Sequence, residues 1–113
     1  MMNLQARVVV AALIFALSAL AQGPRLESLE PPNGRSGDEL VVKGANLGEA
    51  YVSKLYLTIG TSDLEVEVRE QTADTIRFAI PADAKPGRYN LTVETAGPTP
   101  TIMVQPIFCT VEE

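Results

Sequence analysis

The chain offers few side chains that could do covalent chemistry at neutral pH. It has no histidine, so the usual general base is missing, and its single cysteine, Cys109, has no histidine partner to activate it. Glu65 and Glu67 fall two residues apart in an alternating segment, a spacing that would place paired carboxylates on one face of a strand, as in a glycosidase. Arg69 follows at the same period, which is typical of a solvated, charged strand face. We therefore predict that the protein is not an enzyme and has no catalytic residues.

Metal and cofactor binding find little support in the sequence. It contains no Cys-x-x-Cys pair, no histidine cluster and no acidic loop with the spacing of an EF-hand. Asp38, Glu39 and Asp83 fall in loops that could meet at one end of a sandwich and hold calcium through oxygen ligands. The simpler interpretation is that the Asp38 side chain caps the backbone of its own turn. We expect no metal site and no cofactor.

Carbohydrate binding would need exposed aromatic rings, and few are available. Strand alternation places Phe78 and Tyr89 inside the fold and leaves Phe108 undecided. Tyr56 then falls on an outer strand face and Tyr51 in a loop. Tyr51 and Tyr56 are thus the candidate ligand contacts, although the same positions suit ordinary surface residues.

The elements that position these residues follow a period of two. From Gln22 onward, apolar residues alternate with polar ones, and turn residues recur every eight to twelve positions, which is typical of antiparallel β-structure. We predict an all-β fold, a sandwich of about seven strands. The predicted strands lie around Leu26 and Leu29 and over residues 39–44, 55–59, 64–69, 76–80, 89–93 and about 101–111.

Three positions carry specific structural expectations. Ile59 should point inward with the alternate residues of its strand. Cys109 should pack as a small buried hydrophobe, the alternative being an exposed thiol that links two copies. Pro106 interrupts the last strand and leaves its register open, because a proline there demands an edge position or a bulge.

A dense turn precedes the second predicted strand. Pro31 and Pro32 fix φ, and Asn33-Gly34 and Ser36-Gly37 are predicted to supply the positive-φ positions of tight turns. The stretch from 29 to 47 resembles the opening of an IPT/TIG domain, with its pattern of two prolines, glycines and then apolar-x-apolar-x-Gly-x-Asn-apolar. Residues 74–81 and 87–93 resemble two further strand motifs of that family, in the same order.

The resemblance spans roughly residues 25–111 and implies an immunoglobulin-like antiparallel β-sandwich. It also implies a non-catalytic binding or spacer role without naming a ligand. Some IPT/TIG domains accompany starch- or glucan-processing enzymes, which makes a carbohydrate-binding module the alternative function.

The first 21 residues have the features of an export signal. Arg7 precedes an apolar run over residues 8–17, and Ala19-Leu20-Ala21 has the small-x-small form that signal peptidase accepts. We predict a signal-peptide helix over residues 1–21, cleaved between Ala21 and Gln22, and a single domain over residues 22–113. An uncleaved anchor is the alternative, although the apolar stretch is shorter than the roughly 20 residues that span a bilayer.

The net charge of residues 22–113 limits the classes of partner that we expect. Residues 22–113 keep eight basic and fourteen acidic side chains, a net charge of −6. This charge argues against nonspecific binding to nucleic acid or anionic lipid, and we expect no stable membrane insertion after signal cleavage. We expect a secreted, periplasmic or cell-surface module that acts through protein contacts, either with another protein or with itself through unpaired outer strands. Polysaccharide is the alternative partner.

Overall fold

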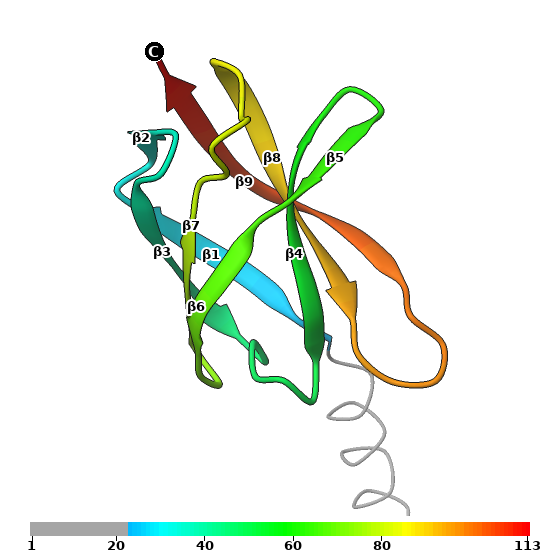
Figure 1. The fold of residues 1–113 in the computed structure, drawn as a ribbon. Helices are drawn as coiled ribbons and strands as arrows, with labels where there is room; N and C mark the ends of the chain where they lie inside the picture. The colour runs from blue at the N-terminus through cyan, green and yellow to red at the C-terminus, as the bar shows by residue number, and fades with distance from the viewer. Residues whose placement is uncertain (1–22) are drawn as a thin grey trace, which may run out of the picture.

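The computed structural model describes residues 23–113, so the predicted signal peptide and its cleavage site at Ala21 and Gln22 lie outside the described residues. Two β-sheets pack face to face, which confirms the all-β sandwich (Figure 1). One sheet has the order β1-β3-β7-β6 and the other β2-β9-β8-β4-β5. The strands are β1 (Arg25–Glu30), β2 (Asn33–Arg35), β3 (Glu39–Ala45), β4 (Val52–Ile59), β5 (Ser62–Glu65), β6 (Glu67–Gln71), β7 (Thr75–Ala79), β8 (Gly87–Thr95) and β9 (Ile102–Glu112).

The chain changes sheet five times within the described residues, between β1 and β2, β2 and β3, β3 and β4, β5 and β6, and β7 and β8. After β1, a cis Glu30–Pro31 peptide and Pro32 lead to β2, which pairs in parallel with the end of β9. Between β5 and β6, the buried Val66 carries the chain from the five-stranded to the four-stranded sheet. All other strand pairs are antiparallel. No helix among residues 23–113 has the length and apolar character needed to cross a membrane.

The sheet change at Val66 corrects one prediction. Residues 64–69 were predicted to form a single strand, but Glu65 pairs with Tyr56 of β4, whereas Glu67 pairs with Ala79 of β7. The predicted burial of Val66 is right. Its side chain packs between the sheets with 5% exposure, and the backbone crosses from one sheet to the other there. The alternation of apolar and polar residues predicts which side chains face inward, but it does not predict which sheet a strand joins.

The opening turn and the β4–β5 hairpin differ in detail from the sequence prediction. Gly37 has the predicted positive φ of 90°, but Asn33 and Gly34 form strand β2 instead of a turn. Gly34 is buried, and a side chain there would meet Asp38 Oδ2, Leu40 and Ile80 at 3.2 to 3.3 Å, so close packing explains this glycine. Ile59 was predicted to face inward but is 45% exposed, because β4 extends beyond the core at the hairpin tip.

The core fills the space between the two sheets. Each large apolar side chain buried there contributes about 1.5 to 3 kcal/mol to folding. Cys109 is fully buried among these residues, as predicted, and makes no disulfide. The four-stranded sheet supplies Leu40, Val42, Ile76 and Phe78, and the five-stranded sheet supplies Leu55, Leu57, Leu91 and Val93, all 0% exposed.

Strand β9 contains the interruption that Pro106 predicts. The pairing with β8 shifts between Asn90 opposite Phe108 and Thr92 opposite Val104, so a bulge includes Pro106. Within it, Gln105 is turned inward and its side-chain oxygen accepts a hydrogen bond of 3.0 Å from the backbone N–H of Leu26 on β1. A buried N–H without a partner costs about 1 to 3 kcal/mol, so Gln105 stabilises the contact between the two sheets along this side.

Gly44 and Asn46 allow the backbone at the end of β3 to lie close to the backbone at the start of β1. A Cβ atom on Gly44 would lie 2.0 Å from the carbonyl oxygen of Arg25, where β1 bulges against β3. Asn46 adopts a left-handed φ of 58°, and its amide donates to the carbonyl of Gly23 over 3.2 Å. Both positions therefore depend on residue types that bring the backbones close together.

Gly44→Ala should destabilise the fold, because the new methyl group forces β1 away from β3. We expect the free energy of unfolding to fall by about 2 to 3 kcal/mol, measured by urea denaturation. Gly48→Ala is the matched control, since a Cβ there would lie 3.8 Å from its nearest neighbour, and it should change stability by less than about 0.5 kcal/mol. Equal losses of stability in the two variants would show that the close approach of β1 to Gly44 does not account for the effect.

Candidate interaction surface

The outer face of the five-stranded sheet holds a half-buried tyrosine, Tyr56, and the exposed apolar side chains that could bind a partner. Strand alternation sends Leu55 and Leu57 into the core and leaves the residues between them outside. The register then fixes which residues of the other strands share that face. They are Asp63 and Glu65 on β5, Lys54, Tyr56 and Thr58 on β4, Arg88, Asn90, Thr92 and Glu94 on β8, and Ile102, Val104, Phe108 and Thr110 on β9.

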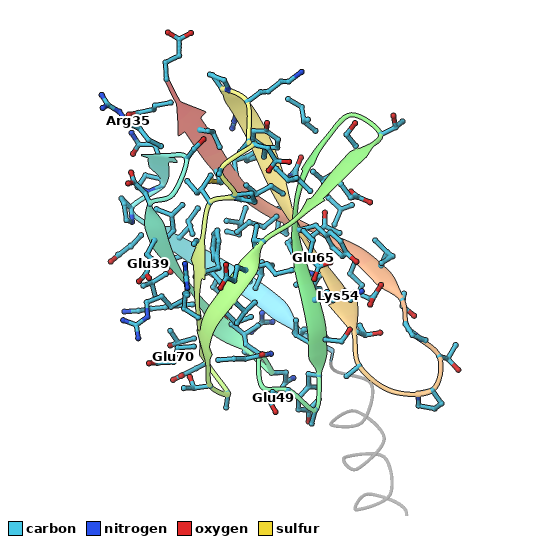
Figure 2. All side chains as sticks on the ribbon, viewed as in Figure 1. Arg35, Glu39, Glu49, Lys54, Glu65 and Glu70 are labelled. Atoms are coloured by element: carbon cyan, nitrogen blue, oxygen red, sulfur yellow. The ribbon has the colours of Figure 1, made fainter. Side chains whose placement is uncertain are left out.

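The half of this face over β4 and β5 is polar and internally bonded. Thr58 donates to Asp63 over 2.7 Å and shares a second hydrogen bond of 2.8 Å with the hydroxyl of Thr92. Lys54 and Glu65 lie on neighbouring strands, their charged atoms 4.0 Å apart (Figure 2). These cross-strand contacts stabilise the pairing of the strands. They also leave fewer polar groups available to bind a ligand.

Tyr51 and Tyr56, the candidate ligand contacts, do not form one platform. Tyr56 is half-buried on β4, with its hydroxyl 3.5 Å from Glu94, and burial, reinforced by that carboxylate, raises the pKa of the phenol above 10.0. Tyr51 is 45% exposed in the loop before β4, where its backbone pairs with Ala96. Five residues at about 3.3 Å each separate the two along the chain, so their rings present separate contacts.

The half of the face over β9 is apolar. Ile102, Val104 and Phe108 are 51%, 62% and 43% exposed, and Pro106 between them is also exposed. We call these four residues the β9 stripe. Contiguous exposed apolar side chains on one strand are typical of surfaces that bind other molecules, because water contact with them is unfavourable.

Arg88 borders the β9 stripe and contacts it. Its guanidinium carbon lies 3.9 Å from the centre of the Phe108 ring, within the range of a cation–π interaction. The ring is therefore held in place on the sheet, with a positive charge at one end of the stripe.

The outer face of the four-stranded sheet has a different character. Arg77 contacts Glu70 at 2.6 Å and Glu39 at 3.9 Å, and Arg69 contacts Glu67 at 3.1 Å. In Figure 2, Glu39 and Glu70 lie on this side of the molecule, away from Glu65. Exposed ion pairs of this kind contribute little stability, but they keep the surface well hydrated and poorly suited to apolar contacts.

The structure separates the two carboxylates that were considered for acid-base chemistry. Glu65 and Glu67 do not share one strand face, because they belong to different sheets, and each pairs with a cation of its own. The carboxylate of Asp38 accepts the backbone N–H of Arg35 over 2.9 Å, as predicted for a turn cap. Among residues 23–113, no three side chains of His, Cys, Asp or Glu gather in the manner of a metal site.

The sequence prediction left the β9 stripe unnoticed, although a signal was present. From Thr95 to Val111 the chain has no charged residue, an unusual run in a domain with a net charge of −6. Alternation places Ile102 and Val104 on one face, but only the pairing with β8 shows that this face points to solvent. Phe108, undecided from sequence, lies on the same face.

Cys109 provides a test of packing next to this surface. Its side chain has no solvent exposure, and burial raises the pKa of the thiol from 9.0 to about 11. The folded state therefore holds the proton more tightly than the unfolded state. Between pH 9 and 11 the free energy of unfolding should fall as pH rises, by up to about 2 to 3 kcal/mol.

The check is urea denaturation across that pH range for the wild type and Cys109→Ala. Lysines and tyrosines titrate in the same range, so the measured quantity is the difference in slope between the two proteins. Cys109→Ala should be less stable at pH 7 but lose less stability on going to pH 11. Parallel slopes would mean that the thiol is accessible to water in the folded state.

Comparison with known proteins supports the fold. No protein-family model matches the chain, and no curated protein does. Solved structures do match, each over 81% of this chain. They are a protein of unknown function from Bacteroides thetaiotaomicron at 21% identity and a TM-score of 0.67, a putative phosphatase from the same species at 20% and 0.58, and an auxiliary nutrient binding protein from Bacteroides ovatus at 24% and 0.58.

The chain spans about a fifth of the length of each matched protein, between 19% and 22%. In those proteins, the similar sandwich is thus one part of a much larger chain. At identities below 25% the similarity establishes the β-sandwich fold alone.

Proposed function

We propose that this chain is an exported, non-catalytic interaction or structural module of the IPT/TIG type, with an immunoglobulin-like fold. It acts through protein contacts at or outside the cell envelope. The observation that carries the proposal is the exposed β9 stripe. Its most exposed large side chain, Val104, has 62% of its surface in contact with water. Contiguous apolar side chains exposed to water on an acidic domain support a binding surface at that place.

The positions that resemble the IPT/TIG pattern have structural roles that support the assignment. In the segment Gly44-Ala45-Asn46, the glycine permits close approach of β1 and the asparagine takes a left-handed conformation. Gly37 in the preceding turn has a positive φ. The resemblance therefore rests on residues with specific backbone roles, which supports the assignment.

A spacer or connecting role is supported by the position of the chain ends. In Figure 1, β1 begins at the lower end of the sandwich, while the C-terminal end of β9 lies at the upper end. A domain with its ends at opposite poles can be joined to neighbours in series. The matched Bacteroides proteins contain a similar sandwich within longer chains.

The test is crosslinking in cells that export the protein. The full chain, including residues 1–22, is expressed with an affinity tag, treated with formaldehyde, and its adducts are separated by denaturing electrophoresis. Val104→Glu places a charge at the centre of the β9 stripe and should reduce adducts at least tenfold, because the contact would have to desolvate the carboxylate. Mass spectrometry of the exported protein should find Gln22 at its N-terminus.

Thr110→Glu is the matched control. Thr110 is exposed on the same strand and the same face, but β2 already pairs with the strand edge at this residue, so no further strand can pair there. This variant should keep the wild-type adducts, and circular dichroism should show both variants folded. Equal adducts in Val104→Glu and the wild type would contradict the proposed binding surface.

Carbohydrate binding is the second candidate. One matched structure is an auxiliary nutrient binding protein, and Tyr51, Tyr56 and Phe108 offer rings that are at least partly exposed. If this candidate is right, migration in native gels cast with soluble polysaccharides should be retarded, and Tyr51→Ala or Tyr56→Ala should abolish the retardation. We expect no retardation, because Tyr56 is half-buried and bonded to Glu94.

A further inference from the structure

The β9 stripe lies on a strand that is paired along one side only. Strand β9 pairs with β8 from Ile102 to Val111, but its other neighbour, β2, pairs only with residues 110–112. Figure 1 shows the first part of β9, in orange, along the outside of β8. Residues 102–104 therefore form a free edge of the five-stranded sheet, and no strand among residues 23–113 pairs with it.

Ile102 and Val104 direct their backbone groups toward this free side. The N–H of Thr95 donates to the carbonyl of Thr101 over 2.9 Å, which makes these two a hydrogen-bonded pair. Bonded and non-bonded pairs alternate along an antiparallel ladder, so Met103 is the next residue to bond β8. The N–H and C=O groups of Ile102 and Val104 then point away from β8. A further strand on that side could form hydrogen bonds with them.

Two prolines delimit this edge. Pro100 precedes the strand and Pro106 lies in its bulge, and neither has an N–H to offer. Beyond Val104 the bulge turns Gln105 inward to β1. The free edge therefore offers two complete residues, Ile102 and Val104, on either side of Met103.

Charge distinguishes this edge from the others and indicates what pairs with it. No charged residue occurs between Thr95 and Val111, whereas the other long edges carry several. Two copies of an acidic domain repel each other wherever their charges meet, and residues 102–104, which form this edge, contribute no charge of their own. The charged edge residues are Arg25, Glu27 and Glu30 on β1, Glu67, Arg69 and Glu70 on β6, and Asp63 and Glu65 on β5.

The inner side of the edge has room for one side chain from a second copy. A groove of about 320 Å³ lies beside it, lined by Gly23, Pro24, Arg25, Ala45, Asn46, Met103 and Gln105. Methionine is flexible and fills irregular space well. The side chain of Met103 from a second copy can therefore occupy this groove when the two strands lie side by side.

We propose that the partner of the β9 stripe is a second copy of this chain, and that two β9 strands pair antiparallel about a two-fold axis at Met103. Ile102 of each copy then lies opposite Val104 of the other, and these residues exchange four backbone hydrogen bonds. Registers centred on Ile102 or Val104 are poorer because they set a proline opposite a residue that needs a donor. The two apolar stripes join into one surface across the axis.

This proposal rests on the proposed function and gives it a partner and a geometry. Pairing through so few residues buries less than a standard protein interface, so the dimer dissociates on dilution. The exported protein should therefore show a weight-average mass in sedimentation equilibrium that rises from that of a monomer toward twice that value with concentration.

Substitutions test the register. Ile102→Pro removes an N–H on the free side without removing one that faces β8, and it should weaken dimerisation at least tenfold while circular dichroism stays unchanged. Ile102→Lys and Val104→Glu should each be monomeric alone but form mixed dimers when combined, since positions 102 and 104 lie opposite each other. Thr110→Glu should dimerise as the wild type does. A wild type that is monomeric at every concentration, or equal dimerisation in all variants, would overturn the proposal.

Photocrosslinking distinguishes this proposal from the proposed function. A photoreactive amino acid is placed at position 104 of the protein in exporting cells, and the adducts are identified. An adduct of twice the monomer mass that contains only this chain supports pairing between copies. An adduct with a different protein overturns that pairing and leaves the interaction module intact. The absence of any adduct overturns both.

Discussion

The whole structure depends on the burial of two apolar sheet faces against each other. With one cysteine and no disulfide, no covalent link holds the strands together, so their positions rest on packing and backbone pairing. The sheets stay in contact because the chain passes between them at Pro31-Pro32 and at Val66, and because Gln105 on one sheet bonds the backbone of the other. Each of these links leaves the inner faces apolar and places polar groups where they are satisfied.

This arrangement gives the two outer faces different chemistry. On the four-stranded sheet, arginines and glutamates form ion pairs within and between strands and remain hydrated. On the five-stranded sheet, the polar residues pair among themselves over β4, β5 and β8, and the apolar side chains are left over β9. The exposed apolar surface is thus confined to a strand that also has unpaired backbone, and both features favour contact with another strand.

The sandwich also makes sense of the comparison with Bacteroides proteins. A similar sandwich forms one part of each of three much longer chains, which shows that this fold occurs within larger proteins. Its role is then set by the few residues on its surface. In this chain the proposed contact residues are Ile102, Val104 and Phe108, which are exposed on β9.

The sequence by itself determined the fold class and most of the core. Leu40, Val42, Ile76 and Phe78 alternate with polar residues, and period two alone assigns them to the inside because one face of each strand must be dry. Turn chemistry likewise predicted the cap at Asp38, and the missing N–H of Pro106 predicted an edge or bulge.

Only the tertiary structure decided which strands share a sheet and which edges stay free. The division of residues 64–69 between two sheets, the exposure of Ile59 and the strand at Asn33–Arg35 all depend on contacts between residues far apart in the chain. The surface over β9 belongs to the same class of feature. Alternation puts Ile102 and Val104 on one face, but whether that face meets a second sheet or water depends on neighbours that no local pattern specifies.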